Sequence, residues 1–599
     1  MGQSFDSASE KKSKAQFNGK VIYDTSNHFC YSASKYLNKI YITEFRREKK
    51  DTTFKRIEKV DFIIGSGQHT NSHIQNVNGY LNQMPLTFYT QKQTWDLPPG
   101  FENGNNTRFG RKIGLECMSC HNAYPAFVEG SENKYSAVPS GIDCERCHGP
   151  GSIHVALKMN GQIIDTATQI DYSIVNPAKL PVDLQFDICQ RCHLQGNAVL
   201  KKDKSFYDFK PGQKLNEVMT VFLPKYANAD KDFIMASHAD RLKQSACFIK
   251  TSQKTNGKSL KPYRDALTCV TCHNPHVSVR ETNNQKFNQA CINCHGKTEE
   301  ALNKLNLAHK KESNNFMSSC VTCHMPSSGS IDIPHVSVHD HYIRKPISTE
   351  NKQAIKKFLG LYAINEKNPE PIVKAEAYIN QFEKFDNKMY YLDSAANILQ
   401  NLQGKEALGL KIRLSFIRKN FQNVITLVEN ESKKNKNLEF NNKSLTNNDA
   451  WTCYRIAESY NYLNKNKEAL PWIQKAANLA PYNIEFRNKL AGLLAASNNW
   501  PAAENEWRFI LKENPKFVPA YTNLGYIKMQ QNEMPLALQF FNQGMKLDPD
   551  NESLLLNLVS YYFKSNNRTM AVEYLQKLIK AHPENAKAKA ALSQLNYHG

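Results

Sequence analysis

The chain has 599 residues, which is enough for at least two domains. Its formal net charge is +21, but the 77 Lys and Arg residues are spread along the whole chain and form no compact basic block, which argues against a nucleic-acid-binding protein. No run of about 18 apolar residues occurs in the sequence, so it predicts no transmembrane helix.

Residues 1–100 carry no cofactor motif. Weak alternation of apolar and polar residues in 20–26 (KVIYDTS) and 39–45 (KIYITEF) predicts short strands there. The first residues, MGQSFDSASEKKSK, lack the apolar segment and cleavage site of a signal peptide.

Residues 101–345 contain six copies of the pattern Cys-x-x-Cys-His, which is typical of covalent haem c attachment. The two thiols reach the two vinyl groups of one haem, and the adjacent imidazole is held beneath the iron as its proximal ligand. A single Cys-x-x-Cys also suits zinc or a redox site, but six copies that all continue with His favour six haems. The attachment cysteines are Cys117, Cys120, Cys144, Cys147, Cys189, Cys192, Cys269, Cys272, Cys291, Cys294, Cys320 and Cys323. The proximal histidines are His121, His148, His193, His273, His295 and His324.

The second axial ligand separates an electron carrier from an enzyme. A low-spin electron-transfer haem commonly takes a second His or Met, whereas a catalytic haem keeps that position open. The region offers nine further histidines, which are His69, His73, His154, His238, His276, His309, His335, His339 and His341. Of these, His73 and His339 are the weakest candidates. Three methionines are alternatives, although Met more often fills a core; they are Met219, Met235 and Met325.

Local spacing constrains some of these histidines. His276 follows proximal His273 by three residues with Pro275 between them, so we expect it to bind the iron of a neighbouring haem. His154 follows His148 by six residues across a Gly-Pro-Gly turn and is expected to do the same. The alternating histidines of IPHVSVHDHY (333–342) predict one face of a strand.

The C-terminal part has a different organisation. Residues 346–449 are expected to be a helical connector with degenerate repeats. The expectation rests on the helix-like residue patterns of 352–364 and 407–417. In residues 450–599, prolines recur every 34 residues and an alanine stands twelve residues before each. This period is typical of tetratricopeptide repeats, pairs of helices that stack into a solenoid. The prolines and alanines are Pro481, Pro515, Pro549, Pro583, Ala469, Ala503, Ala537 and Ala571.

Several strings resemble the doubled-CXXCH, cytochrome c-552/c-554-like multihaem cytochromes that carry a C-terminal tetratricopeptide array: ECMSCHNAYP, GIDCERCHGPGSIH, ASHADRLKQSACF, LTCVTCHNPH and CVTCHMP with PHVSVHDH. The resemblance implies a mainly α fold, with a loop-rich multihaem domain followed by an α-solenoid. It implies export, and a seventh haem motif ahead of residues 1–100, which would then be a truncated N-terminal part. It favours seven distal ligands, namely His69, His154, His238, His276, His309, His335 and His341.

Three functions are compatible with these patterns. The leading hypothesis is a periplasmic, outer-envelope or extracellular electron carrier, docked to a redox partner or membrane complex by its repeat array. The second is a multihaem oxidoreductase of the hydroxylamine or nitrite type with one open haem. The third is a scaffold protein of an envelope complex. The number of candidate distal histidines favours the carrier.

Overall fold

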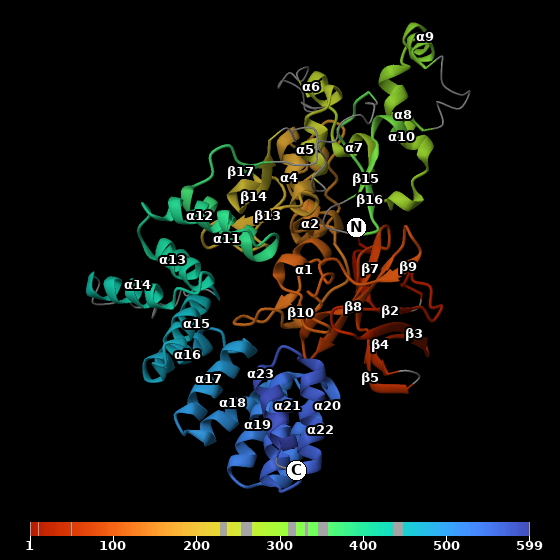
Figure 1. Cartoon of the computed structure of the whole chain (residues 1–599). Helices are drawn as coiled ribbons and strands as arrows, with labels where there is room; N and C mark the ends of the chain where they lie inside the picture. Colours follow the sequence, from red (N-terminus) through yellow and green to blue (C-terminus); the bar gives the residue numbers. More distant parts are fainter. Residues whose placement is uncertain are drawn as a thin grey trace.

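The computed structural model describes residues 2–9, 11–48, 51–227, 237–252, 266–309, 319–329, 334–345, 357–434 and 447–597. Figure 1 shows strands in the N-terminal region (red), short helices in the motif region (orange to yellow-green) and paired helices in the C-terminal region (green to blue). The paired helices curve back, so that the last of them lie below the N-terminal strands. Within the described ranges, no helix has the length and apolar character needed to cross a membrane.

Two antiparallel sheets form the N-terminal region. One has the strand order β2-β3-β4-β5, and the other has the order β1-β6-β7-β8-β10 with β9 paired to β8. The strands are β1 (Phe5–Ser7), β2 (Val21–Tyr23), β3 (Cys30–Tyr36), β4 (Lys39–Glu48), β5 (Asp51–Lys59), β6 (Phe62–Ile64), β7 (Thr70–Val77), β8 (Tyr80–Tyr89), β9 (Thr94–Asp96) and β10 (Arg111–Lys112). The strands predicted from 20–26 and 39–45 are therefore present as β2 and β4.

The core of this region lies between the two sheets. Successive side chains of a strand point to opposite faces, and the buried Ile40 and Ile42 lie on the same face of β4. They belong to the same apolar cluster as Met84, Leu86 and Phe88 of β8 in the other sheet. An expectation of a mainly α chain thus has to be corrected here, because residues 1–100 form a β structure with its own core.

Within its described residues, the motif region contains ten short α-helices with short strands between them. The helices are α1 (Leu115–His121), α2 (Glu145–His148), α3 (Ser152–Met159), α4 (Val182–His193), α5 (His238–Lys243), α6 (Ala246–Ser252), α7 (Cys269–Cys272), α8 (Asn284–His295), α9 (Glu299–Ala308) and α10 (Cys320–His324). The strands are β11 (Ala126–Phe127), β12 (Tyr135–Ala137), β13 (Asn197–Leu200), β14 (Met219–Tyr226), β15 (Ser327–Gly329) and β16 (Ser337–His339).

A strand joins the motif region to the connector. The prediction of a helix over 352–364 is wrong for its described part, because β17 (Phe358–Ala363) pairs antiparallel with β14. Leu361 of β17 is buried in one cluster with Phe222 of β14 and Tyr391 of the next helices. Burial of this segment against the sheet favours a strand. The periodicity of the sequence does not reveal that burial. Residues 346–356 lie outside the described residues.

The remaining chain is helical. The connector contains α11 (Pro371–Lys384), α12 (Met389–Leu399), α13 (Lys405–Ile417) and α14 (Phe421–Lys434). The repeats follow as α15 (Asn447–Tyr462), α16 (Asn466–Leu479), α17 (Ile484–Ala496), α18 (Trp500–Glu513), α19 (Val518–Gln530), α20 (Met534–Leu547), α21 (Glu552–Lys564) and α22 (Arg568–Ala581), and α23 (Ala586–Tyr597) ends the array. The prediction that the C-terminal region is a solenoid of paired helices is confirmed.

Each repeat is built from the same local devices. The four prolines follow the second helices, and the four alanines are fully buried where the paired helices cross. An asparagine with positive φ ends each turn between paired helices, since Asn tolerates the left-handed conformation; these are Asn464, Asn498, Asn532 and Asn566, again 34 residues apart. Gly525 allows close helix contact, because a Cβ there would stand 2.3 Å from Cε1 of Phe541.

The loops between repeats pack on the N-terminal sheets, so the two ends of the chain meet. Arg108 binds the buried Glu44 and also Asp548, to which its Nη1 donates at 2.7 Å. Arg46 donates to both carboxylate oxygens of Asp550 at 2.6 and 2.5 Å. Further ion pairs join Glu58 to Lys516, Lys134 to Glu513, Lys112 to Glu485 and Glu48 to Lys580.

Candidate haem-binding centres

All six Cys-x-x-Cys-His motifs lie on single helical turns. Five of the helices end at the motif histidine, and α7 ends at Cys272, one residue before His273. Residues three apart share a face of a helix, so each turn presents both thiols on one side. None of the fifteen cysteines, all of which lie in the described ranges, forms a disulfide. Burial raises the pKa of the Cys117 thiol to about 11.

Cysteines of different motifs lie against one another. Cys192 of the third motif hydrogen-bonds Cys120 of the first, and this contact raises the pKa of Cys192. Cys189, also of the third motif, hydrogen-bonds Cys269 of the fourth, which raises the pKa of Cys189 in the same way. A hydrogen bond likewise joins Cys291 of the fifth motif to Cys320 of the sixth. The motif helices are therefore packed motif against motif.

Four proximal histidines each face one of the candidate distal histidines. An imidazole nitrogen lies about 2 Å from a bound metal and the ring centre roughly 1 Å further away, so two rings on opposite sides of one iron have centres about 6 Å apart. The four pairs have ring centres separated by 6.0 Å (His148 and His276), 6.5 Å (His193 and His238), 6.3 Å (His273 and His341) and 6.1 Å (His324 and His309).

His276 lies beside the histidine of another motif. Its ring is nearly parallel to that of His148, with an interplanar angle of 12°, so it faces the second motif. The proximal histidine of its own motif, His273, faces His341 instead. The rings of His238 and His341 are only 4.3 Å apart, too close to hold one iron between them, so they belong to two adjacent sites.

The tautomers of four histidines suit iron binding. Nδ1 lies within 2.8 to 3.0 Å of a backbone carbonyl oxygen in His148, His309, His324 and His341. A carbonyl oxygen only accepts, so Nδ1 carries the proton and Nε2 keeps the lone pair that binds a metal.

Burial favours the neutral form of other histidines in the region. It lowers the pKa of His121 and His341 to about 4 and that of His238 to about 3, which keeps these imidazoles uncharged. The Nδ1 atoms of His69, His121 and His238 are buried without a hydrogen-bond partner in the structure. Neutral, desolvated imidazoles are the form in which histidine binds metals. The donor set therefore fits haem.

The other three favoured distal candidates do not face a proximal ring in the described part of the chain. His154 Nδ1 contacts Ser173 Oγ at 2.9 Å. His69 is half-buried near Gln91. His335 directs Nε2, the usual metal-binding atom, to Asp96 at 2.7 Å. No histidine ring within the described ranges faces His121 or His295.

The strand prediction for 333–342 is wrong in detail for its described residues, 334–342. Only His339 lies within β16, and its Nδ1 contacts the carbonyl oxygen of Met325. His335 precedes the strand with a φ of +59°, and His341 follows it, so the three do not share a face. A non-glycine residue with positive φ marks a turn, which ends the alternation.

The weaker candidates have ordinary structural roles. His73 is fully buried in β7, stacks on Trp95 at 5.1 Å and hydrogen-bonds the Leu86 carbonyl. Met219 belongs to an apolar cluster with Phe209. Met235 lies outside the described residues.

A buried ion pair holds two of the distal candidates in place. Arg241 donates from Nε and Nη2 to the two oxygens of Asp340 at 2.8 and 2.6 Å. It lies one helical turn after His238 in α5, and Asp340 directly precedes His341. Burial alone would raise the pKa of Asp340, but the hydrogen bonds from Arg241 bring it below its usual value. Sequence reasoning missed this pair, although the strings HADR and HDH contain it.

Known proteins match both halves of the chain. The family described as "Doubled CXXCH motif" matches residues 261–300, which hold the fourth and fifth motifs, and tetratricopeptide families match 452–483, 488–552 and 528–595. "Multiheme cytochrome MtrA" of Shewanella baltica (strain OS185) is 24% identical over 227 residues, which are 36% of this chain and 62% of that protein. The chain joins a doubled-CXXCH multihaem cytochrome c to a tetratricopeptide array. It binds haem c.

Other similarities concern the repeats. "Uncharacterized protein ycf37" of Cyanophora paradoxa is 26% identical over 110 residues, 18% of this chain and 64% of that protein. The chain thus spans less than two thirds of the length of either curated relative. Among solved structures, MamA (17% identical, TM-score 0.24) is covered to 99% and matches 31% of this chain, and YrrB (18%, TM-score 0.24) is covered to 98% and matches 36%. These superpositions are too weak to add to the repeat assignment.

Proposed function

We propose that this multihaem cytochrome is an exported electron carrier with bis-histidine haems, and that its repeat array binds a partner protein. The observation that carries the proposal is the set of four facing histidine pairs, each joining a motif histidine to a distant one. A second axial imidazole fills the position that an enzyme would leave open for substrate.

Different residues of the chain would attach each haem and coordinate its iron. Each motif cysteine pair anchors one haem, and the histidine after it supplies the proximal nitrogen. From the four pairs we infer that His276, His238, His341 and His309 are the distal ligands of the second, third, fourth and sixth motifs, an inference supported by the ring separations. When bound, haem c supplies a one-electron couple at its iron.

The contacts between motifs define a route. The first motif adjoins the third, the third adjoins the fourth, and the fifth adjoins the sixth. Cys294 of the fifth motif raises the pKa of Cys272 of the fourth electrostatically, so these two motifs are also close to each other. A continuous series of close haems suits transfer through the protein. The repeat array lies beside this route. Its extended surface suits the binding of a protein that exchanges electrons with the carrier.

The experiment is a count of haems and of open irons. The full chain, exported in a host that matures c-type cytochromes, is assayed by pyridine haemochrome and mass spectrometry, and its ferric EPR spectrum is recorded. We expect six covalent haems and low-spin signals from at least the four paired sites. Fewer than six haems in fully matured protein, or high-spin signals from the four paired sites, would contradict the proposal.

An oxidoreductase is the second candidate. It is favoured by His121 and His295, which face no other imidazole in the described part of the chain. High-spin ferric signals that shift when nitrite or hydroxylamine is added would support this candidate.

A further inference from the structure

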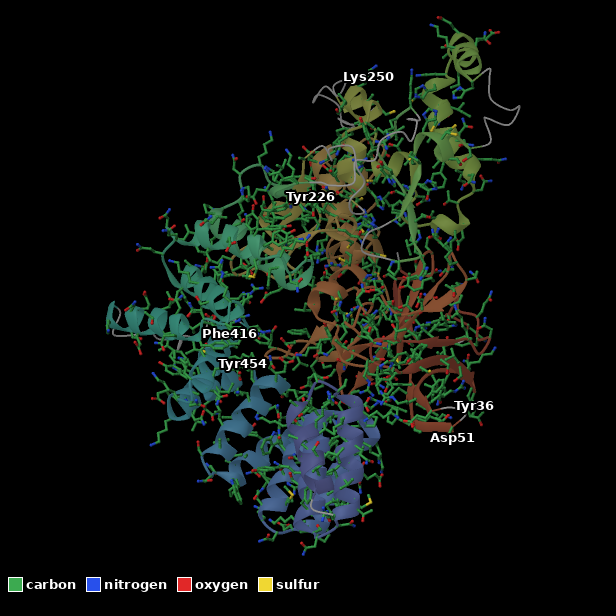
Figure 2. The ribbon with its side chains drawn as sticks, viewed as in Figure 1. Tyr36, Asp51, Tyr226, Lys250, Phe416 and Tyr454 are labelled. Carbon is green, nitrogen blue, oxygen red and sulfur yellow. The ribbon has the colours of Figure 1, made fainter. Side chains whose placement is uncertain are left out.

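An aromatic groove lies where the connector meets the first repeat. Its volume is about 420 Å³, and α13, α14 and α15 supply most of its walls. Figure 2 shows Phe416 and Tyr454 near one another at this junction. The other lining residues are Glu383, Ile417, Lys419, Phe421, Trp451, Arg455 and Tyr462.

The walls of the groove are organised aromatic contacts. Phe421 and Tyr462 stack with ring centres 4.3 Å apart and an interplanar angle of 3°. Phe416 meets Phe421 edge to face at 5.7 Å. Tyr462 is 61% exposed, so the stack opens to solvent. Exposed, ordered aromatic rings are typical of surfaces that bind other molecules.

One cation of the groove, Arg455, has no hydrogen-bond or ion-pair partner among the described residues. The half-buried guanidinium of Arg455 lies over the Trp451 ring at 5.5 Å and makes no hydrogen bond or ion pair within the described residues. The nearest carboxylates are not free, because Arg413 binds Glu383 and approaches Glu376 to 3.7 Å. Burial, followed by the repulsion of Arg413, lowers the pKa of Arg455 to about 10. An unpaired charge in such surroundings is unfavourable unless another group compensates it.

The repeats provide an internal comparison for this position. The residues 34, 68 and 102 positions after Arg455 are Lys489, Asn523 and Asn557. Lys489 binds Glu458 at 2.6 Å and Asn461 at 2.7 Å on the preceding first helix. Asn523 and Asn557 likewise donate to Asn488 and to the carbonyl of Thr522 at 3.4 Å. Arg455 stands at the start of the array, and the helix before it offers aromatic rings instead of an acceptor.

We propose that this groove binds a segment of the partner protein in which an acidic side chain adjoins an aromatic one. The carboxylate pairs with the fork of Arg455, whose geometry matches two oxygens at once. The aromatic side chain packs against the Phe416, Phe421 and Tyr462 rings. The exposed Lys419 at the rim, which has no ion-pair partner among the described residues, adds to the attraction for an acidic segment. The proposal rests on the proposed partner-binding role of the array and gives that partner a chemistry.

The test uses the full haem-loaded chain and a fluorescein-labelled, C-terminally amidated peptide GSFEFSG, with binding followed by fluorescence anisotropy. Peptides GSFQFSG and GSSESSG are the controls for charge and for aromatic contact. We expect GSFEFSG to bind at least tenfold more tightly than either control. Arg455→Gln should remove this preference for Glu over Gln, and Arg455→Lys should restore only part of it.

Arg508→Gln is the matched control, because Arg508 lies in the array and pairs with Glu504 on its own helix. It should leave binding unchanged, and the melting temperatures of all variants should agree. Equal binding of GSFEFSG and GSFQFSG, no binding at all, or an unaltered preference in Arg455→Gln would overturn the proposal. The haem count and EPR spectrum are independent of this result. The groove proposal can therefore be contradicted while the electron-carrier proposal stands.

Discussion

His276 faces His148 with ring centres 6.0 Å apart, although only two residues separate it from His273. The short spacing prevents the chain from returning to the same iron, and the fold uses it to join the fourth motif to the second. If His276 is the distal ligand that we propose for the second motif, the fourth motif's segment helps to hold the neighbouring haem.

His276→Ala should convert one low-spin haem to high-spin without loss of covalent haem, because the thioethers and all proximal histidines remain. Ferric EPR together with mass spectrometry measures both quantities. His339→Ala is the control, since His339 faces no proximal ring in the described structure and should leave the spectrum unchanged. A full low-spin count in well-loaded His276→Ala would exclude the ligand role.

Gly525→Ala should destabilise the array, because the added Cβ meets the Phe541 ring at 2.3 Å. Overpacking of this kind costs about 1–3 kcal/mol, which thermal or urea unfolding followed at 222 nm would detect. Gly492→Ala is matched to it, since Gly492 is also in a first helix but a Cβ there meets nothing within 4 Å. Replacement of Gly492 should be neutral or stabilise by up to about 1 kcal/mol. Equal effects of the two changes would contradict the packing.

Arg108→Ala should loosen the contact between the N-terminal sheets and the array. It leaves Glu44, which has no exposed side-chain surface, without its partner, and also removes the bond to Asp548. Breaking a buried pair in this way costs about 3–5 kcal/mol. Limited proteolysis of the folded protein should show faster cleavage between the two parts. Arg508→Ala, which removes an exposed pair within one helix, should cost less than about 1 kcal/mol.

Glu58 should make the same contact sensitive to acid. Burial alone would raise its pKa, but Arg56 and Lys516 more than compensate and lower it. The unfolded chain therefore binds a proton more readily than the folded one, so the stabilisation is complete above the ordinary Glu pKa of about 4.3. It is lost as the pH falls below that value. Unfolding free energies between pH 6 and pH 3 should fall less steeply in Glu58→Gln, and an identical slope would exclude the coupling.

The sequence contained the local chemistry but not the distant contacts. Six motif turns, the strand at 39–45 and the 34-residue repeat follow from spacing and alternation, because a helical turn or a strand face is decided by nearby residues. The pairing of β17 with β14 was not predictable, since Leu361 is a strand residue only because β14, where Pro224 is its partner, lies beside it. The same holds for Arg241 and Asp340, which are 99 positions apart. The pairing of His276 with His148 needed the fold to choose among several motifs.

Arg46 and Asp550 are 504 positions apart and yet form a two-pronged ion pair, so the chain closes into a ring. A solenoid normally has one free end and changes its curvature easily, because each repeat touches only its neighbours. Here one end is attached through β17 to the haem-bearing region and the other through charged loops to the N-terminal sheets. A partner that binds the array therefore meets a surface whose curvature is already set, and less conformational entropy is lost on association.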